Sequence, residues 1–275
     1  MTAHLPQAFE LKDKVVVITG GAGLLGESHA RVLAQAGAHP VLADIDGDRA
    51  VELALELTES NSQRSLGLRL DVGDEASVKR MVKLTVENFG RLDGLVNNAA
   101  LDPKFDADSA GQHGVGFEDF PLDAWQRALD VNVTGMFLCA REVAPVMLEQ
   151  GQGVIINVAS TYGLVAPDQR LYARAGQPPA YKPVTYSVAK AAVLGLTRYL
   201  ASYYAGRGIR VNTLTPGGVF AEHDDEFVAR YSAKTMLGRM ADRQEISNAL
   251  LFLLSEASSY MTGANLVVDG GWTAW

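Results

Sequence analysis

The chain has 275 residues, of which 48% are hydrophobic and 20% are charged, and its formal net charge is −8 at pH 7. These proportions are those of an ordinary globular protein and exclude a disordered or fibrous chain. Because the net charge is negative, nucleic acid is disfavoured as a partner.

Strands and helices alternate along the N-terminal half of the chain. Short apolar runs predict strands, and apolar residues at helical spacing predict the helices between them. The predicted elements, in order, are a strand at 15–18, a helix through Ala30, Leu33 and Ala34, a strand at 40–43, a helix at 48–60, a strand at 66–70, a helix at 75–89 and a strand at 92–96.

The alternation continues in the C-terminal half. The predicted elements are a long helix over much of 123–150, a strand at 153–159, a helix at 184–207, a strand at 209–214, a helix at 243–255 and a strand at 265–268. Repeated strand–helix units require a parallel sheet with helices on both faces. We therefore predict an α/β fold: one doubly wound Rossmann-type domain over residues 1–275, with about seven parallel strands.

Two segments are too long to be short connections. They cover about 100–121 and 163–183, and the second contains four prolines. Each follows the end of a predicted strand, which is where ligands bind in parallel sheets, and long loops in a compact domain are usually functional. We expect both insertions to lie beside the substrate.

The cysteine, histidine and apolar residues limit which other sites and locations the sequence allows. The only cysteine, Cys139, excludes an intrachain disulfide and is expected to be a buried helix residue. No metal site is expected, because the five histidines are scattered. The first ten residues lack the pattern of a secretory signal, and no uninterrupted apolar run approaches the roughly 20 residues of a membrane span. A cytoplasmic protein without a membrane partner is the expectation.

A glycine turn between the first strand and the first helix predicts a dinucleotide site. Its sequence is Thr19-Gly20-Gly21-Ala22-Gly23-Leu24-Leu25-Gly26. Gly20 would make the tight turn, Gly23 would let the backbone approach a pyrophosphate, and Gly26 would allow close helix packing. The phosphates would then lie at the helix N-terminus, beside Leu24 and Leu25. A purely structural turn is the alternative.

An acidic residue at the end of the second strand favours NAD over NADP. Asp44 can accept hydrogen bonds from both adenosine ribose hydroxyls, and its charge would repel a 2′-phosphate. The glycine turn contains no Arg or Lys, and the first one after Asp44 is Arg49, so a 2′-phosphate lacks an obvious partner. Asp44 could also be a simple turn or capping residue.

Tyr186 and Lys190 are the candidate catalytic pair. Four positions apart on a predicted helix, they share one face. A neighbouring ammonium favours the phenolate and is expected to lower the tyrosine pKa, so that Tyr186 can exchange a proton with an alcohol. Ser160 follows the strand 153–159 at its C-terminal end, where its hydroxyl can bind the reacting oxygen.

Together these motifs resemble the short-chain dehydrogenase/reductase family, over about residues 14–272. The resemblance implies that Asn132 shapes a proton relay behind Lys190, that Lys190 also grips the nicotinamide ribose, and that hydride passes between nicotinamide and an alcohol or carbonyl carbon. It also implies further cofactor contacts at Asp71, Val72, Asn98, Ala99, Pro216, Gly217 and Val219.

The chain departs from the compact members of this family at two points. Its glycine spacing is G-x-x-G-x-x-G, which is typical of extended members such as sugar-nucleotide epimerases, and Leu24 takes the place of the middle glycine of the compact type. Ala221 stands where many compact members have a threonine near the carboxamide.

The insertions suggest a polar substrate. The second carries three cations, Arg170, Arg174 and Lys182, and one acid, Asp168. One of these cations is a candidate ligand for a substrate phosphate or carboxylate, and Tyr162 is a further candidate substrate residue. A solvated basic loop is the alternative. The first carries Asp102, Lys104, Asp106, Asp108 and His113. The insertions resemble a subgroup named for flagellin-sugar modification, which implies a sugar, sugar phosphate or other hydroxylated substrate.

Two other functions compete with a dehydrogenase. A sugar-nucleotide epimerase or dehydratase that retains NAD fits the glycine spacing, but such enzymes need a larger C-terminal domain than the roughly 60 residues after Leu214. A non-catalytic dinucleotide sensor would keep the fold but usually loses Tyr186 or Lys190. The family resemblance also implies a homo-oligomer, a tetramer or a dimer, formed through the helices at 123–150 and 184–207.

Overall fold

The computed structural model describes residues 6–61, 63–102, 114–174, 176 and 178–275, and its centre is a seven-stranded parallel sheet. The strands are β1 (Val15–Thr19), β2 (His39–Asp44), β3 (Leu66–Arg69), β4 (Gly94–Asn97), β5 (Gly153–Val158), β6 (Ile209–Pro216) and β7 (Asn265–Val268). Their order is β3-β2-β1-β4-β5-β6-β7, so the chain reverses its direction across the sheet between β1 and β4. Ligands bind outside the carboxyl ends of strands at such a switch point.

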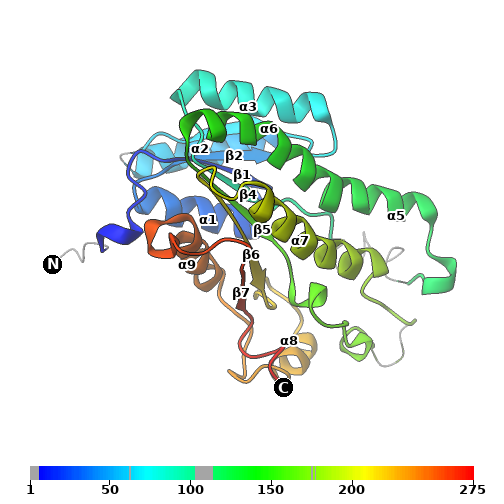
Figure 1. The fold of residues 1–275 in the computed structure, drawn as a ribbon. Helices are drawn as coiled ribbons and strands as arrows, with labels where there is room; N and C mark the ends of the chain where they lie inside the picture. The colour runs from blue at the N-terminus through cyan, green and yellow to red at the C-terminus, as the bar shows by residue number, and fades with distance from the viewer. Residues whose placement is uncertain (1–5, 62, 103–113, 175, 177) are drawn as a thin grey trace.

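Helices cover both faces of this sheet (Figure 1). One face carries α1 (Leu24–Gln35), α2 (Gly47–Ser60) and α9 (Arg243–Leu254), and the other carries α3 (Glu75–Phe89), α6 (Gly135–Gln150) and α7 (Val184–Tyr203). A hydrophobic core lies between the sheet and the helices on each face, and strand β1 contributes to both cores. Val15 and Val17 pack into one core, and Val16 and Ile18 pack into the other. Full burial explains why this strand is continuously apolar rather than alternating. The predicted α/β sheet with helices on both faces is confirmed.

The long helix expected over 123–150 is not uniform. It consists of α5 (Leu122–Leu129), a π-helical turn (Asp130–Thr134) and α6. The stretch Leu122–Gln150 is long and apolar enough to cross a membrane by length and composition, and half of that apolar window is buried in the protein. That buried half includes Cys139, whose expected burial is confirmed; burial raises the pKa of its thiol to about 12.

One helix beside the catalytic end of the sheet was not predicted. Helix α8 (Asp225–Ser232) begins after Asp224, whose side chain accepts a hydrogen bond from the backbone N–H of Phe227. It has only eight residues and one buried side chain, Tyr231, so its helical periodicity in the sequence is weak. Its position matters, because α8 packs against the insertion at 163–183.

Candidate active site

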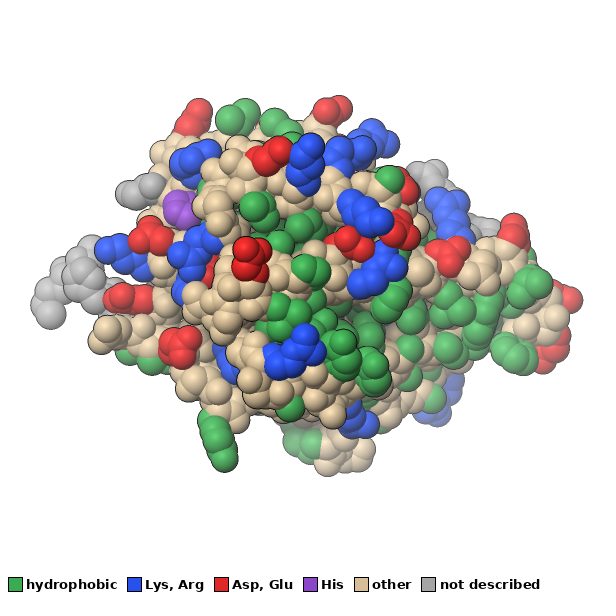
Figure 2. All heavy atoms as spheres, turned by 45° about the horizontal axis from the view of Figure 1, so that its top comes forward, with side chains coloured by type: hydrophobic (Ala, Val, Ile, Leu, Met, Phe, Trp, Pro, Cys, Tyr) green, Lys and Arg blue, Asp and Glu red, His purple; other side chains and the backbone are tan. Residues whose placement is uncertain are grey.

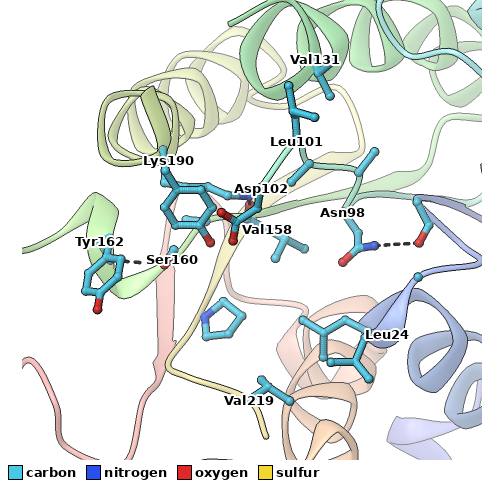
Figure 3. Close-up of a pocket in the computed structure, with 18 of the residues that line it drawn as sticks. Leu24, Asn98, Leu101, Asp102, Val131, Val158, Ser160, Tyr162, Lys190 and Val219 are labelled. Carbon is cyan, nitrogen blue, oxygen red and sulfur yellow. Dashed lines mark hydrogen bonds between the residues drawn. The ribbon is translucent and has the colours of Figure 1, made fainter. Parts of the chain in front are cut away.

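A cavity of about 930 Å³ opens at the carboxyl ends of the central strands. Figure 3 shows its two ends, with Leu24 and Asn98 on one side and Ser160, Tyr162 and Lys190 on the other. Its volume lies at the upper end of the range for small-molecule and cofactor sites.

The glycine turn forms the first end of the cavity, and Gly20 and Gly26 leave no room there for a side chain. Gly20 has φ of +65°, and a Cβ atom there would lie 2.9 Å from the Ala99 Cα atom. A Cβ atom at Gly26 would lie 2.1 Å from the Gly20 carbonyl oxygen. Helix α1 begins after Gly23, which offers no side chain to accept hydrogen bonds from the first N–H groups of the helix. These unpartnered donors and the helix dipole fit a pyrophosphate.

Leu24 and Leu25, the first residues of α1, also line this end. Leu24 is 39% exposed, so the side chain that replaces the middle glycine of the compact pattern faces the cavity instead of the packed interface with the sheet. The departure in the glycine spacing is therefore accommodated without a clash.

Asp44 is fixed at the end of β2 with its carboxylate beside the turn. One oxygen accepts a hydrogen bond of 2.9 Å from the Ala22 N–H, and the other accepts one of 3.1 Å from the Asp46 N–H. The nearby Arg49 is bound to Glu52 at 2.6 Å and does not line the cavity. Among the described residues, the Lys and Arg side chains on the cavity wall are Arg127, Lys182 and Lys190.

Asn98 and Ala99 connect β4 to the glycine turn. The Asn98 side-chain amide donates to the carbonyl oxygens of Thr19 (3.0 Å) and Gly20 (3.1 Å), and the Ala99 N–H donates to the Thr19 hydroxyl (3.0 Å). Both residues line the cavity, as do the expected contacts Asp71, Val72, Pro216, Gly217 and Val219. The structure therefore brings the predicted cofactor residues from five strand ends to one wall.

The catalytic candidates meet at the other end of the cavity. Tyr186 and Lys190 lie in the first two turns of α7, and the Lys190 Nζ atom is 5.8 Å from the centre of the Tyr186 ring. That ammonium donates to the Val158 carbonyl oxygen at 2.9 Å, which holds it against the end of β5. The Ser160 side chain lies close enough to Tyr186 to affect the pKa of its phenol. Tyr186, Lys190 and Ser160 thus line one cavity, in which Figure 3 labels the lysine and the serine.

The expected lowering of the tyrosine pKa is not what the structure indicates. Desolvation, and next the negative charge of Asp102, raise the pKa of Tyr186, while the Ser160 side chain lowers it. Burial lowers the pKa of Lys190 to about 8. In the protein without cofactor, therefore, the phenol is protonated at neutral pH and most of Lys190 carries its charge.

Asn132 lies in the π-helical turn and is 1% exposed. Its amide accepts a hydrogen bond of 2.6 Å from the Leu101 N–H and donates one of 3.0 Å to the Leu101 carbonyl. A π-turn widens the helix and is frequent at functional sites. Here it directs Asn132 toward the start of the first insertion, so its contact is with Leu101, and a relay through it to Lys190 stays a prediction.

Only one of the three candidate substrate cations lies on the cavity wall. Lys182 lines it, with Tyr162, whereas Arg170 and Arg174 do not. Arg170 is 87% exposed and binds Asp168 at 2.8 Å, and Arg174 binds Asp224 at 2.8 Å. The expected local excess of positive charge is wrong for these two residues, because α8 and Asp168 supply the balancing acids.

Several cavity residues were not predicted as site residues. One is Asp102, which forms an ion pair with Lys182. The others form an aromatic group: Tyr172 from the second insertion, His223 before α8, and Phe227 and Tyr231 on α8. The Tyr231 ring stacks on Trp272 at 4.2 Å between centroids. The spacing of Phe227 and Tyr231, i and i+4, is the one signal in the sequence that could have located this aromatic wall. Lys104, Asp106, Asp108 and His113 lie outside the described residues.

Known proteins share this arrangement over nearly the whole chain. Residues 22–273 match a family model described as enoyl-(acyl carrier protein) reductase. A solved short-chain type dehydrogenase/reductase from Mycobacterium marinum has a TM-score of 0.85 and 33% identity, with 98% of each chain covered. This chain belongs to the short-chain dehydrogenase/reductase family. It is therefore an oxidoreductase of a family that binds a nicotinamide dinucleotide.

Two further relatives have names that state the alcohol each of them oxidises. A cis-4-hydroxycyclohexanecarboxylate dehydrogenase from Sinomonas cyclohexanicum is 36% identical over 267 residues, covering 95% of this chain and 97% of that protein. A solved gluconate 5-dehydrogenase from Burkholderia cenocepacia, in complex with NADP and tartrate, has a TM-score of 0.84 and 30% identity, with 98% of each chain covered.

Proposed function

We propose that this enzyme uses NAD to interconvert a secondary alcohol and a ketone on a polar, ring-shaped substrate. The observation that carries the proposal is the placement of Tyr186, Ser160 and Lys190 at one end of a cavity whose other end holds Asp44 and the start of α1. The nicotinamide cofactor and the reacting carbon–oxygen bond of a substrate would both lie within that one cavity.

The preference for NAD rests on Asp44. Its two oxygens are held by backbone N–H groups at the cavity edge, where its charge would repel a 2′-phosphate. Arg49, the nearest cation in sequence, is held away by Glu52. The relative that was solved with NADP leaves this preference open to test.

The chain's own residues divide the chemistry between them. The cofactor, held by the glycine turn, Asp44, Asn98 and the segment after β6, would accept or supply the hydride. Ser160 donates to the reacting oxygen and polarises it. Tyr186, a phenol in the free enzyme, gives its proton to that oxygen in reduction and takes it back in oxidation. Lys190 stays fixed by Val158, where its positive charge favours the phenolate that reduction leaves behind.

A hydroxylated ring fits the cavity better than a sugar phosphate. Tyr162, Tyr172, Phe227 and Tyr231 supply aromatic faces for an alicyclic ring or the C–H face of a sugar. Arg170 and Arg174, the cations expected to bind a phosphate, are paired with Asp168 and Asp224 outside the cavity. The named substrate of the Sinomonas relative is a ring alcohol that also carries a carboxylate and has no phosphate. A flagellin-sugar subgroup and a cytoplasmic location stay predictions.

The competing functions have less support. Against an epimerase of the extended type, relatives that cover nearly the whole chain carry the names of dehydrogenases. A non-catalytic sensor has no need for a serine, tyrosine and lysine grouped at the cavity end. Retention of bound NAD without net NADH formation would favour the epimerase.

Substitution of Tyr186 by phenylalanine tests the proposal. Tyr186→Phe should lower kcat for a ring alcohol such as cyclohexanol by about 10²-fold or more, because a positioned general acid or base contributes about that much. NAD binding, measured by calorimetry, should change by less than about threefold. Tyr260→Phe is the matched control, because Tyr260 is fully exposed and outside the cavity. Turnover of Tyr186→Phe within about tenfold of the wild type would refute the assignment.

A further inference from the structure

The two insertions meet in an ion pair beside the reacting tyrosine. The Lys182 Nζ atom lies 2.6 Å from an Asp102 carboxylate oxygen and 4.2 Å from the centre of the Tyr186 ring. The Lys182 side chain is 10% exposed and that of Asp102 is 36% exposed, and both line the cavity. Figure 3 shows Asp102 reaching into the same space as Ser160 and Lys190.

Both partners are held in place by neighbouring groups. The Lys182 N–H donates to the Gln169 side chain at 2.8 Å, and the Gln169 amide donates back to the Lys182 carbonyl at 3.3 Å. Asp102 follows Leu101, whose N–H and carbonyl are both bound by the Asn132 side chain. The pair is therefore built into the cavity wall, unlike a flexible ion pair between two solvated side chains.

An ion pair of this kind can distinguish substituents on a substrate by the hydrogen bonds that each can donate and accept. An ammonium only donates hydrogen bonds and a carboxylate only accepts them, so a hydroxyl group can satisfy both, accepting from Lys182 and donating to Asp102. A carboxylate or phosphate would be repelled by Asp102. A bare CH₂ group would displace water from both charges and replace none of the lost hydrogen bonds.

We propose that Asp102 and Lys182 form a specificity subsite for a second hydroxyl group, on the ring carbon next to the one that Tyr186 and Ser160 act on. This inference rests on the proposed alcohol chemistry and adds the substrate class, a vicinal diol or its hydroxyketone. The charge of Asp102 reaches the reaction centre: it adds to the rise in the pKa of Tyr186 and partly opposes the fall that burial causes in the pKa of Lys190.

Selectivity between paired alcohols tests the subsite. NAD reduction is followed with cis- and trans-cyclohexane-1,2-diol and with cyclohexanol, for the wild type, Asp102→Asn, Lys182→Met and the double variant. The wild type should favour one diol over cyclohexanol by at least about tenfold in kcat/KM, and each single variant should reduce that ratio by about tenfold, the size expected for hydrogen bonds to charged groups. The double variant should lose little more than either single variant, because both residues bind one hydroxyl.

The outcomes separate the possible failures. A merely structural ion pair would lower kcat/KM for diols and cyclohexanol by the same factor and leave the ratio unchanged, which would overturn the subsite alone. A wild type without preference for either diol would do the same. Absence of turnover with all three alcohols would refute the proposed ring-alcohol chemistry together with the subsite. Arg170→Met, a cation of the same insertion outside the cavity, should leave the ratio at its wild-type value.

Discussion

At the scale of single residues, the chemistry depends on side chains whose polar atoms are already oriented by the backbone. Asp44 is held by two N–H groups, Lys190 by the Val158 carbonyl, and Asn98 by the glycine turn. Such residues could be predicted from the sequence because each follows a strand end or shares a helix turn with its partner. The direction of the shift in the Tyr186 pKa could not be predicted, since it depends on desolvation and on Asp102, which is distant in sequence.

The proposed preference for NAD rests on Asp44 and is testable there. Asp44→Ser should lower the ratio of kcat/KM for NAD to that for NADP by at least about tenfold, because it removes a charge that repels the 2′-phosphate. Adding Ile45→Arg, on a cavity-lining residue that is 57% exposed, should shift the preference further toward NADP. Asp46→Ser is the control: Asp46 caps α2 outside the cavity and serine is also a good N-cap, so both the stability and the ratio should stay close to their wild-type values. An unchanged ratio in Asp44→Ser would remove the basis for NAD preference.

At the scale of elements, the second insertion is attached to α8 by ion pairs. Arg174 binds Asp224, Arg230 donates to the carbonyls of residues 170 and 173, and Lys234 binds Asp168. The basic residues of this insertion were predicted as substrate ligands because the sequence gives only their local charge. The structure instead pairs Arg170 with Asp168 of the same insertion and Arg174 with Asp224, the residue that caps α8.

Removal of one of these ion pairs tests whether Arg174 attaches the insertion to α8 or binds an anionic group of the substrate. Arg174→Met should raise KM about two- to fivefold for neutral and for phosphorylated ring alcohols alike, because partly exposed ion pairs contribute up to about 1 kcal/mol. The exchange Arg174→Asp with Asp224→Arg should recover part of the loss. Lys83→Met, which removes an exposed pair with Glu87 on α3, is the control. An effect on the phosphorylated substrate alone would identify Arg174 as an anion ligand.

At the scale of the whole molecule, hydrophobic side chains remain on the outer surface of the layer formed by α6 and α7. Figure 2 shows them as a band across the face turned toward the viewer. Phe137 is 46% exposed, Val188 41%, Tyr199 65% and Tyr203 54%. Contiguous apolar patches of this kind mark protein–protein contacts. We therefore propose that copies of this chain associate through α6 and α7 into a homotetramer or dimer.

A charge placed in this band should dissociate the assembly. Tyr199→Glu is expected to convert the oligomer to a smaller species in sedimentation velocity at micromolar concentration, because a buried unpaired carboxylate is strongly unfavourable. Leu55→Glu, at a 61% exposed position on α2, should leave the sedimentation coefficient unchanged. A monomeric wild type, or an unaffected Tyr199→Glu, would contradict the proposed interface.

The sequence by itself determined the strand–helix alternation, the glycine turn, the Asp44 position and the Tyr186–Lys190 pair, because periodicity and short spacings encode all of them locally. Only the tertiary structure decided how the insertions act. Asp102 and Lys182 are 80 positions apart, and Asn132 and Leu101 are 31 apart. Contacts over such separations depend on how the strands are ordered in the sheet and on where α8 packs. The reaction type was therefore accessible from local pattern, and the substrate subsite from the folded chain.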